Sequence, residues 1–466
     1  MPRAAPLQRR MPAIPSPSRW FWLPWVVVGW FACPGCQPAV ESTPQAVSLP
    51  SLPRDPAEDG LGAERWPGWR GLNGSGVAPG GSPAIRFGPA EGFRWKVEVP
   101  GEGYSSPVVW DDWVFLTSAL RDTERPALVL LAFGRSDGTL RWRAEVGNAR
   151  GRTHNKNGYA SATVATDGER VVACFGAAGL VCYDFSGELL WRADLGDMDH
   201  QWGAASSPVL HDGLVIQLCD SEHNSYLAAF DKRTGEPVWR TPRPSKGCWT
   251  TPILVASGTG EKRRVELVVN GTSSPSRNGR MVTAYDPTSG RELWRVRGTT
   301  EQVVPTAMTA GGLIYSTSGR NGPILAIRPG GSGDVTASHC VWKTRRGGPY
   351  IPSGVVYRNR LYLVNDAGLL SCFDRGNGML LWSKRLRGPF TASLVAADGR
   401  LYATSERGTV YVLAAADSFR LLAQNDMGAR CLATPALAGG DLFLRTQEHL
   451  YCIRAREETT GDDGVR

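Results

Sequence analysis

The segment Asp231-Lys-Arg-Thr-Gly-Glu-Pro-Val-Trp239 recurs along this chain, with clean copies at Asp286–Trp294 and Asp374–Trp382. In this pattern the Asp side chain accepts hydrogen bonds from backbone N–H groups two residues on, and the Gly adopts the positive φ of a tight turn. The Trp then contributes a large apolar ring with one N–H donor. We interpret each copy as a turn that leads into the outermost strand of a repeated β unit.

The tryptophans and the strand starts that follow them set the period of the repeat. The tryptophans lie 40–55 residues apart, at Trp95, Trp142, Trp191, Trp239, Trp294, Trp342 and Trp382. Eight strand starts, each of which contains Ser, Thr or Pro, begin at Tyr104, Tyr159, Ala205, Trp249, Val304, Ile351, Phe390 and Leu432. A period of about 40–50 residues with four short β runs predicts a β-propeller.

Three copies of the turn depart from the pattern. The copy that begins at Asp184 is one residue short, Gly134 replaces the Asp before Trp142, and an insertion rich in Gly and Ser separates Arg328 from Trp342.

The two ends of the repeat region together supply one blade. Phe93–Val99 is an outermost strand without three strands before it, and the last unit has only the runs Leu432–Leu437, Asp441–Arg445 and His449–Arg454. We therefore predict an all-β, eight-bladed propeller of four-stranded antiparallel blades over residues 93–455, with the ring closed by the N-terminal strand. Such pairing removes an open sheet edge that would invite aggregation.

Residues 1–36 have the features of an export signal with a lipobox. Arginines precede the apolar run Phe21–Ala32, which is too short to span a bilayer, and small residues follow it. We expect lipidation at Cys36, after Gly35, with Cys33 as the competing site. Simple cleavage and an uncleaved anchor are the alternatives. Two acyl signals would attach the protein firmly to a membrane.

The remaining segments outside the repeat are short. We expect residues 37–64 to be a flexible tether, residues 65–92 to be an N-terminal cap, and residues 456–466 to be a disordered tail. The string Trp66-Pro-Gly-Trp-Arg-Gly-Leu-Asn-Gly74 has no place in the repeat. We interpret it as a cap that packs Trp66 and Trp69 on the outer or lower surface of the ring, with a partner-docking motif as the alternative.

Charge and composition favour a turn-dense β protein that does not bind nucleic acid. The chain has 55 Gly and 33 Pro, and the runs between them are apolar and alternating. The formal charge of +8 falls to +4 without residues 1–36, and the remaining Lys and Arg are scattered.

Eight cysteines lie beyond the signal region. Cys182, Cys372 and Cys452 occupy the same place on the third strand of their units, so we expect them to be small buried core residues. Cys174 and Cys182 flank one hairpin, and a bridge between them is the alternative.

The Asp-x-x-Thr-Gly-x-x-x-Trp repeat resembles the pyrroloquinoline-quinone (PQQ)-type repeat family. That family includes the quinoprotein dehydrogenases and the lipoprotein propeller of outer-membrane β-barrel assembly. A narrower likeness, to PQQ-binding-like propellers of planctomycete-type bacteria, is carried by Trp66–Gly74 and by the strings that start at Gly101, Asn157, Ile327 and Glu448. The resemblance implies an exported eight-bladed propeller, and for the narrower group it implies no agreed activity.

The resemblance also supplies an enzymatic alternative. Quinoprotein dehydrogenases hold PQQ with calcium, acidic and amide ligands, a catalytic Asp, a Trp floor and often a vicinal disulfide. This sequence has no adjacent Cys pair and lacks the long insertions that cover such cofactors. We therefore expect no catalytic residues, no metal and no cofactor, with PQQ binding or PQQ-dependent oxidation as the alternative.

The loops before the first strand of each unit should converge on one face around the central channel. Polar and aromatic groups on a concave surface are the default candidates for binding. The candidates here are His154, Asn155, Lys156, His200, Gln201, Trp202, Trp249, Glu301, Tyr350 and Arg430. His154 and His200 have the alternative role of bonding to loop backbone groups, and no His or Cys spacing matches a zinc site.

These observations lead to one hypothesis about function. We expect a monomeric, non-catalytic interaction platform, exported to the periplasm or anchored to a membrane by lipid, that binds protein partners at the cell envelope.

Overall fold

The computed structural model describes residues 63–89, 92–121, 125–271 and 280–455. All of them belong to one compact unit, Ser51–Arg466. The export signal, Cys33 and Cys36, most of the tether and the C-terminal tail lie outside the described residues. No helix among the described residues is long and apolar enough to cross a membrane.

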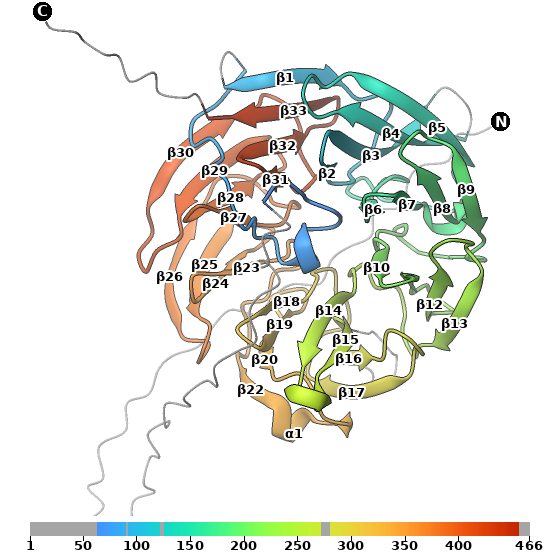
Figure 1. The fold of residues 1–466 in the computed structure, drawn as a ribbon. Helices are drawn as coiled ribbons and strands as arrows, with labels where there is room; N and C mark the ends of the chain where they lie inside the picture. Colours follow the sequence, from blue (N-terminus) through green and yellow to red (C-terminus); the bar gives the residue numbers. More distant parts are fainter. Residues whose placement is uncertain (1–62, 90–91, 122–124, 272–279, 456–466) are drawn as a thin grey trace, which may run out of the picture. The chain divides into compact units, whose positions relative to one another are not determined.

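The described strands form eight sheets arranged as the blades of one propeller ring (Figure 1). Blades 1 and 2 contain β2 (Val108–Trp110), β3 (Trp113–Leu120), β4 (Ala127–Gly134), β5 (Leu140–Asn148), β6 (Ala165–Thr166), β7 (Arg170–Cys174), β8 (Leu180–Asp184) and β9 (Leu189–Ala193). Blades 3 and 4 contain β10 (Val209–His211), β11 (Leu214–Cys219), β12 (Tyr226–Asp231), β13 (Pro237–Pro242), β14 (Ile253–Ser257), β15 (Arg264–Val269), β16 (Met281–Tyr285) and β17 (Glu292–Arg297). In each blade the first strand is innermost.

The second half of the ring follows the same order. Blades 5 and 6 contain β18 (Met308–Ala310), β19 (Leu313–Thr317), β20 (Ile324–Ile327), β22 (Cys340–Lys343), β23 (Val355–Tyr357), β24 (Arg360–Val364), β25 (Leu369–Asp374) and β26 (Leu380–Arg385). Blades 7 and 8 contain β27 (Val395–Ala397), β28 (Arg400–Thr404), β29 (Thr409–Ala414), β30 (Leu421–Asp426), β31 (Ala436–Ala438), β32 (Asp441–Arg445) and β33 (His449–Arg454). The helical segments among the described residues are η2 (Leu72–Gly74), η3 (Gly176–Ala178), η4 (Gly260–Lys262) and α1 (Thr336–His339).

The N-terminal strand closes the ring, as the sequence predicts. β1 (Phe93–Glu98) pairs antiparallel with β33, and its register places Trp95 opposite Cys452. Blade 8 therefore takes its outer strand from the start of the propeller region and its three inner strands from the end. The two ends lie side by side at the top of Figure 1, in blue and red.

The repeated Trp docks onto the turn of the next blade. Its indole N–H donates to the carbonyl of the residue after the Asp position, at 2.8–3.2 Å, in the pairs Trp95–Arg135, Trp142–Phe185, Trp191–Lys232, Trp239–Pro287, Trp342–Arg375 and Trp382–Ala416. The turn glycine packs on the same ring: a Cβ on Gly290, where φ is +70°, would lie 2.3 Å from Trp239. The motif thus joins neighbouring blades.

Trp294 departs from this arrangement because of the insertion between Arg328 and Trp342. The inserted residues form α1 and β21 (Gly333–Asp334), which pairs parallel with β17 and makes blade 4 five-stranded. Trp294 is fully buried, and its N–H donates to Glu266 Oε2 at 2.7 Å instead of to a turn carbonyl.

The Ser and Thr residues of the strand starts form a chain of hydrogen bonds around the inner wall. In seven of the eight blade joints, a backbone N–H donates at 2.9–3.3 Å to the hydroxyl of the equivalent residue in the next blade, along the series Ser106, Thr163, Ser207, Thr251, Thr306, Ser353, Ser393 and Thr434. At the joint of blades 8 and 1, Arg445 donates instead to Ser105 Oγ at 2.8 Å. The strand-start motif thus locks each blade to the next.

We expect Ser393→Ala to lower the free energy of unfolding by about 1–3 kcal/mol, because it leaves the buried N–H of Ser353 without an acceptor. Ser383→Ala, on the exposed side of β26, is the matched control and should change it by less than about 0.5 kcal/mol. Urea denaturation of both variants measures the difference. Equal midpoints would mean that the hydroxyl chain contributes nothing to the joint.

The segment before β1 crosses the channel and closes it. Trp66 is buried and pairs with Val109 in blade 1. Trp69 donates to Thr306 Oγ1 at 2.9 Å in front of blade 5, and the fully buried Arg70 donates to the carbonyl of Leu394 at 3.0 Å. Figure 1 shows η2 in the middle of the ring.

The same segment then continues over blade 7. Val77 forms a parallel bridge with Ala396, and Tyr402 donates to the carbonyl of Pro83 at 3.0 Å. Residues 65–89 therefore tie blades on opposite sides of the axis together, and Arg70 and Trp69 close one end of the channel.

The described cysteines are free thiols. Cys182, Cys372 and Cys452 are fully buried, each opposite the outer-strand Trp of its own blade, in agreement with the prediction. The alternative of a Cys174–Cys182 bridge is wrong: in the β7–β8 ladder Cys174 lies opposite Leu180, and Cys182 lies opposite Val172.

Candidate functional site

A cavity of about 500 Å³ occupies the central channel above Trp69. Each blade contributes one residue to its wall, two positions before the Ser or Thr whose hydroxyl takes part in the chain of hydrogen bonds between blades. These wall residues are Tyr104, Ser161, Ala205, Trp249, Val304, Ile351, Thr391 and Leu432. Trp69 and five of the locking hydroxyl residues line the deeper part. The wall of the cavity is therefore mostly apolar, with two hydroxyl residues (Ser161 and Thr391), and its base is rich in hydroxyl groups and closed by Trp69.

The loop between β5 and β6 reaches across the mouth of the cavity. Lys156 Nζ contacts Glu406 Oε1 at 2.6 Å in blade 7, and Arg430 donates to the carbonyl of Asn155 at 3.0 Å. Thr391 donates to the same Glu406 oxygen at 2.7 Å. Salt-bridged Lys156 is thus fixed over the opening, and His154 beside it also lines the cavity.

A second polar group at the mouth surrounds Tyr350. The Tyr350 hydroxyl donates to Gln302 Oε1 at 3.0 Å, and its backbone N–H donates to Asp366 Oδ2 at 2.8 Å. The guanidinium of exposed Arg320 lies 5.8 Å from the Tyr350 ring centroid. Burial raises the pKa of Asp366, whose other carboxylate oxygen is buried without a partner among the described residues.

Three aromatic side chains form the third part of the mouth. Trp202 and Trp249 stack with ring centroids 5.3 Å apart, and Trp249 donates to the carbonyl of Gly203 at 2.9 Å. His200 packs on the other side of Trp249, with centroids 4.5 Å apart. His200 is buried, both of its ring nitrogens lack a partner among the described residues, and it does not line the cavity.

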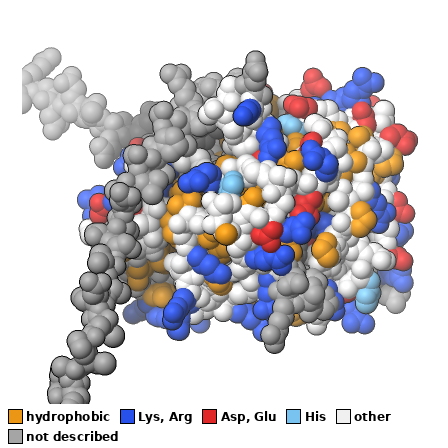
Figure 2. Space-filling model, turned by 90° about the horizontal axis from the view of Figure 1, so that it is seen from below, with side chains coloured by type: hydrophobic (Ala, Val, Ile, Leu, Met, Phe, Trp, Pro, Cys, Tyr) orange, Lys and Arg blue, Asp and Glu red, His pale blue; other side chains and the backbone are white. Residues whose placement is uncertain are grey.

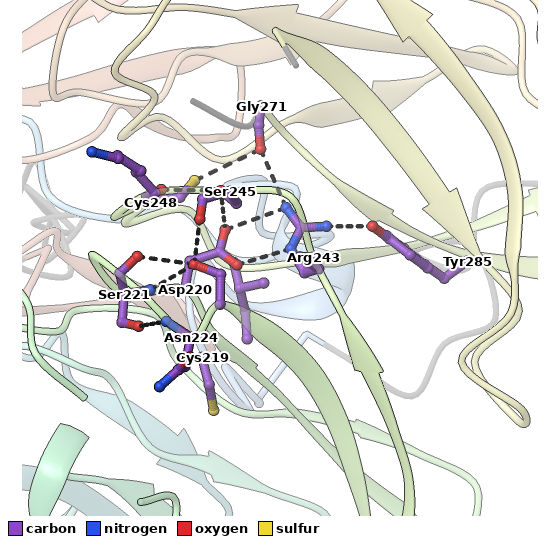
Figure 3. Close-up of polar contacts among 12 residues, drawn as sticks. Cys219, Asp220, Ser221, Asn224, Arg243, Ser245, Cys248, Gly271 and Tyr285 are labelled. Atoms are coloured by element: carbon purple, nitrogen blue, oxygen red, sulfur yellow. Dashed lines mark hydrogen bonds and ion pairs between the residues drawn. The ribbon is translucent and has the colours of Figure 1, made fainter. Parts of the chain in front are cut away.

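A buried ion pair holds the loop that presents Trp249 (Figure 3). Arg243 donates to Asp220 Oδ1 at 2.8 Å, and both side chains are fully buried. Arg243 also donates to the Tyr285 hydroxyl, and Ser245 donates to Asp220 Oδ2 at 2.9 Å. The network joins the loops that follow β11 and β13 to the end of β16. It therefore fixes the backbone that leads from β13 to Trp249.

We expect the stability of the protein to decrease as the pH falls below neutral, partly because of His200. Burial lowers the pKa of His200, against the opposing effect of Glu222 and Asp220. As the pH falls through the ordinary value of 6.5 the unfolded chain takes up a proton first, so the folded state loses stability down to the lowered pKa. Urea denaturation at pH 7.5 and 5.5 should therefore show a smaller loss for His200→Phe than for the wild type. Identical losses would show that His200 is not the titrating group.

The other predicted residues occupy the same face but not the cavity. Asn155 and Gln201 are exposed. Glu301 is exposed and forms an ion pair with Arg280. The structure therefore brings His154, Lys156, Trp202, Trp249 and Tyr350 together around the cavity, and places the remaining candidates beside or beneath them.

Sequence reasoning missed Trp69, Arg320 and Asp366. Trp69 belongs to the cap, and nothing in its local sequence indicates that the cap enters the channel. The wall residues, by contrast, had a readable signal. Each wall residue lies two positions before the locking Ser or Thr in its strand start. Alignment of the eight strand starts therefore identifies the wall residues.

The outer rim of the ring has a different character. Exposed apolar residues are found on or next to the outermost strands, including Leu190, Val238, Met379 and Leu380. On the face that Figure 2 shows, hydrophobic side chains are interspersed with both basic and acidic ones. Apolar residues spread in this way are ordinary for a protein surface.

Comparison with known sequences identifies one family and one relative. The family described as outer membrane protein assembly factor BamB matches residues 90–245 and 277–457. BamB of Burkholderia pseudomallei (strain K96243) is 26% identical over 217 residues, which cover 45% of this chain and 49% of that protein. The chain thus spans about half the length of this curated relative.

Solved structures with the same fold include a BamB protein and a quinohemoprotein dehydrogenase. BamB from Moraxella catarrhalis aligns with a TM-score of 0.55 and 14% identity, over 77% of this chain and 98% of that chain. Quinohemoprotein alcohol dehydrogenase from Comamonas testosteroni aligns with a TM-score of 0.63 and 13% identity, over 88% and 84%. These likenesses concern the fold alone. By the match over most of its propeller, the chain belongs to the family described as outer membrane protein assembly factor BamB.

Proposed function

We propose that this protein is a non-catalytic interaction platform of the cell envelope that acts like an outer-membrane assembly factor. It binds a protein partner at the loop face, which is the end of the ring where the loops before the innermost strands surround the cavity. The observation that carries this proposal is membership of the BamB family together with a closed-ended cavity whose mouth presents Trp202, Tyr350 and Arg320. Exposed aromatic and Arg side chains are favoured anchors in protein interfaces.

Replacement of a BamB protein tests this function. The chain should raise the level of folded outer-membrane proteins in a bacterium that lacks its own BamB. Trp202→Ala combined with Arg320→Ala should reduce that effect, while Val238→Ala on the rim should not. Failure of the wild-type chain in a bacterium where it is exported would contradict the proposal.

Export and lipid attachment form the second part of the proposal. Residues 1–36 support it by their sequence alone. We expect metabolic labelling with a fatty-acid analogue to mark the wild type, and Cys36→Ala to abolish the label and release the protein from membranes. Label lost only in Cys33→Ala would move the site, and no label in the wild type would contradict lipidation.

The PQQ-dependent alternative does not fit the described residues well. They bring together no group of three His, Cys, Asp or Glu side chains that could hold a metal ion. The sequence also has no adjacent Cys pair for a vicinal disulfide, and we derive no reaction through a quinone. Thermal stabilisation by PQQ with Ca²⁺, together with dye reduction, would restore the alternative.

A further inference from the structure

Two buried guanidinium groups lie behind residues that line the cavity, and neither has an acidic partner among the described residues. Arg70 is fully buried and donates to carbonyls, including those of Leu394 and Gly354. Arg445 is 1% exposed and donates to Ser105 Oγ and to the carbonyl of Thr117, both at 2.8 Å. Burial lowers the pKa of each to about 9. A buried positive charge without a counter-ion is costly for the fold.

Both charges lie directly behind cavity residues. Leu394 follows Ser393, which lines the cavity, and Ser105 follows the wall residue Tyr104. Two nitrogens of Arg445, Nε and Nη2, are buried without a partner among the described residues. The protein between the two guanidinium groups and the cavity has a low dielectric constant. The positive potential of Arg70 and Arg445 therefore extends into the cavity.

The base of the cavity offers hydrogen-bond donors. The locking hydroxyls of Thr251, Thr306, Ser353, Ser393 and Thr434 line it, and each oxygen accepts a backbone N–H from the preceding blade. Since the oxygen is used as an acceptor, the hydroxyl proton is left to donate. A ligand with acceptor oxygens is therefore favoured at this depth.

The acidic side chains at the cavity leave the balance positive. Glu406 is neutralised by Lys156. Asp366 accepts the backbone N–H of Tyr350 and supplies one negative charge against the three guanidinium groups of Arg70, Arg445 and Arg320. At the mouth, Arg320 is exposed and forms no ion pair with a described residue.

We propose that the cavity binds a carboxylate carried on an aromatic or aliphatic body. The mostly apolar wall and Trp69 contact the body of the ligand. The hydroxyls at the base donate hydrogen bonds to the carboxylate, and Arg70, Arg445 and, at the mouth, Arg320 supply the positive potential. Because Trp69 closes the cavity, a chain cannot thread through it and only an end group fits. The ligand is thus a free organic acid or the C-terminal residue of a polypeptide. This inference deepens the proposed function, since it names the chemistry recognised at the same face.

Three small probes with the same body test whether the cavity prefers a negatively charged ligand. Calorimetry with the purified full-length protein at pH 7 should show 3-phenylpropionate binding at least about tenfold tighter than 3-phenylpropanamide, because hydrogen bonds to a charged group are the stronger. The amine 3-phenylpropylamine should not bind. Preference for the amine would identify Asp366 as the dominant pole and overturn the proposal, as would equal binding or no binding of all three.

Variants of residues at the cavity test where the probe binds. Ala205→Phe fills the cavity from the wall and should abolish binding while the protein still melts cooperatively. Arg320→Gln should weaken binding about two- to fivefold, as loss of an exposed charge pair does, and Arg320→Lys should restore it. Unchanged binding in Ala205→Phe would place the probe elsewhere and overturn the proposal.

Acetyl-Gly-Gly-Phe as free acid and as C-terminal amide identifies the source. Tighter binding of this peptide acid than of 3-phenylpropionate indicates a polypeptide end, and the reverse order indicates a free organic acid. Probe binding needs no partner protein, so the inference can fail while BamB replacement succeeds, and replacement can fail while the probes bind.

Discussion

A chain that begins at residue 100 is expected not to fold into a closed ring. It lacks β1, so β33 loses its neighbour along Phe93–Glu98, and a row of backbone N–H and C=O groups at the edge of blade 8 is left unpaired. Exposed strand edges pair with other chains. We therefore expect soluble aggregates in size-exclusion chromatography and loss of a cooperative melting transition.

A chain that begins at residue 92 is the matched control. It keeps β1 but lacks Trp66, Trp69 and Arg70, which cross the channel. We expect this chain to be monomeric and to melt cooperatively at a lower temperature than the full protein. If the chain that begins at residue 100 behaves in the same way as this control, the ring is not closed by β1.

The second large effect is expected at Trp294. This ring is fully buried, and its N–H donates to Glu266, a buried carboxylate that also accepts from Ser257 and Arg264. Trp294→Ala should lower the free energy of unfolding by about 3–5 kcal/mol, the usual cost of removing a buried aromatic side chain. Urea denaturation followed by circular dichroism measures it.

Two further variants separate packing from hydrogen bonding at this position. Trp294→Phe keeps most of the ring but leaves Glu266 with one donor fewer, so it should cost less than Trp294→Ala. Trp239→Ala is the comparison between blades, and it should also cost less, because Trp239 is only partly buried at its blade joint. Equal losses for all three would mean that burial of Trp294 is not the source of its effect.

The ring and its closure are predictable from the sequence because they depend on local chemistry that repeats. The Asp, Gly and Trp of each turn have fixed roles, and the orphan strand at residues 93–99 leaves one arrangement in which every blade has at least four strands. Even the cavity wall follows from the repeat, since each wall residue precedes a locking hydroxyl by two positions.

The contents of the channel depend on contacts between residues far apart in the chain, and these leave no local pattern. Trp69 contacts Thr306, and Arg70 contacts Leu394, over more than two hundred residues. The same holds for His200: its sequence places it in a loop, but packing against Trp249 buries it. Whether a loop residue faces solvent or the core is decided by the neighbouring blade.

We propose that the loop face, and not the rim, contacts the partner. The loop face presents Trp202, Tyr350 and Arg320 around a cavity that is closed at its base. The rim presents apolar residues such as Val238, which is 51% exposed, and these are spread over separate blades.

Site-specific photo-crosslinking in intact cells tests this claim most directly. A photoactivatable amino acid is placed at Gln201 or Arg320 on the loop face and at Val238 on the rim, and adducts are identified by mass spectrometry. We predict that both loop-face positions crosslink to the same outer-membrane assembly partner and that Val238 gives no such adduct. An adduct with that partner from Val238 and none from Gln201 or Arg320 would contradict the proposal that the loop face is the partner-binding surface.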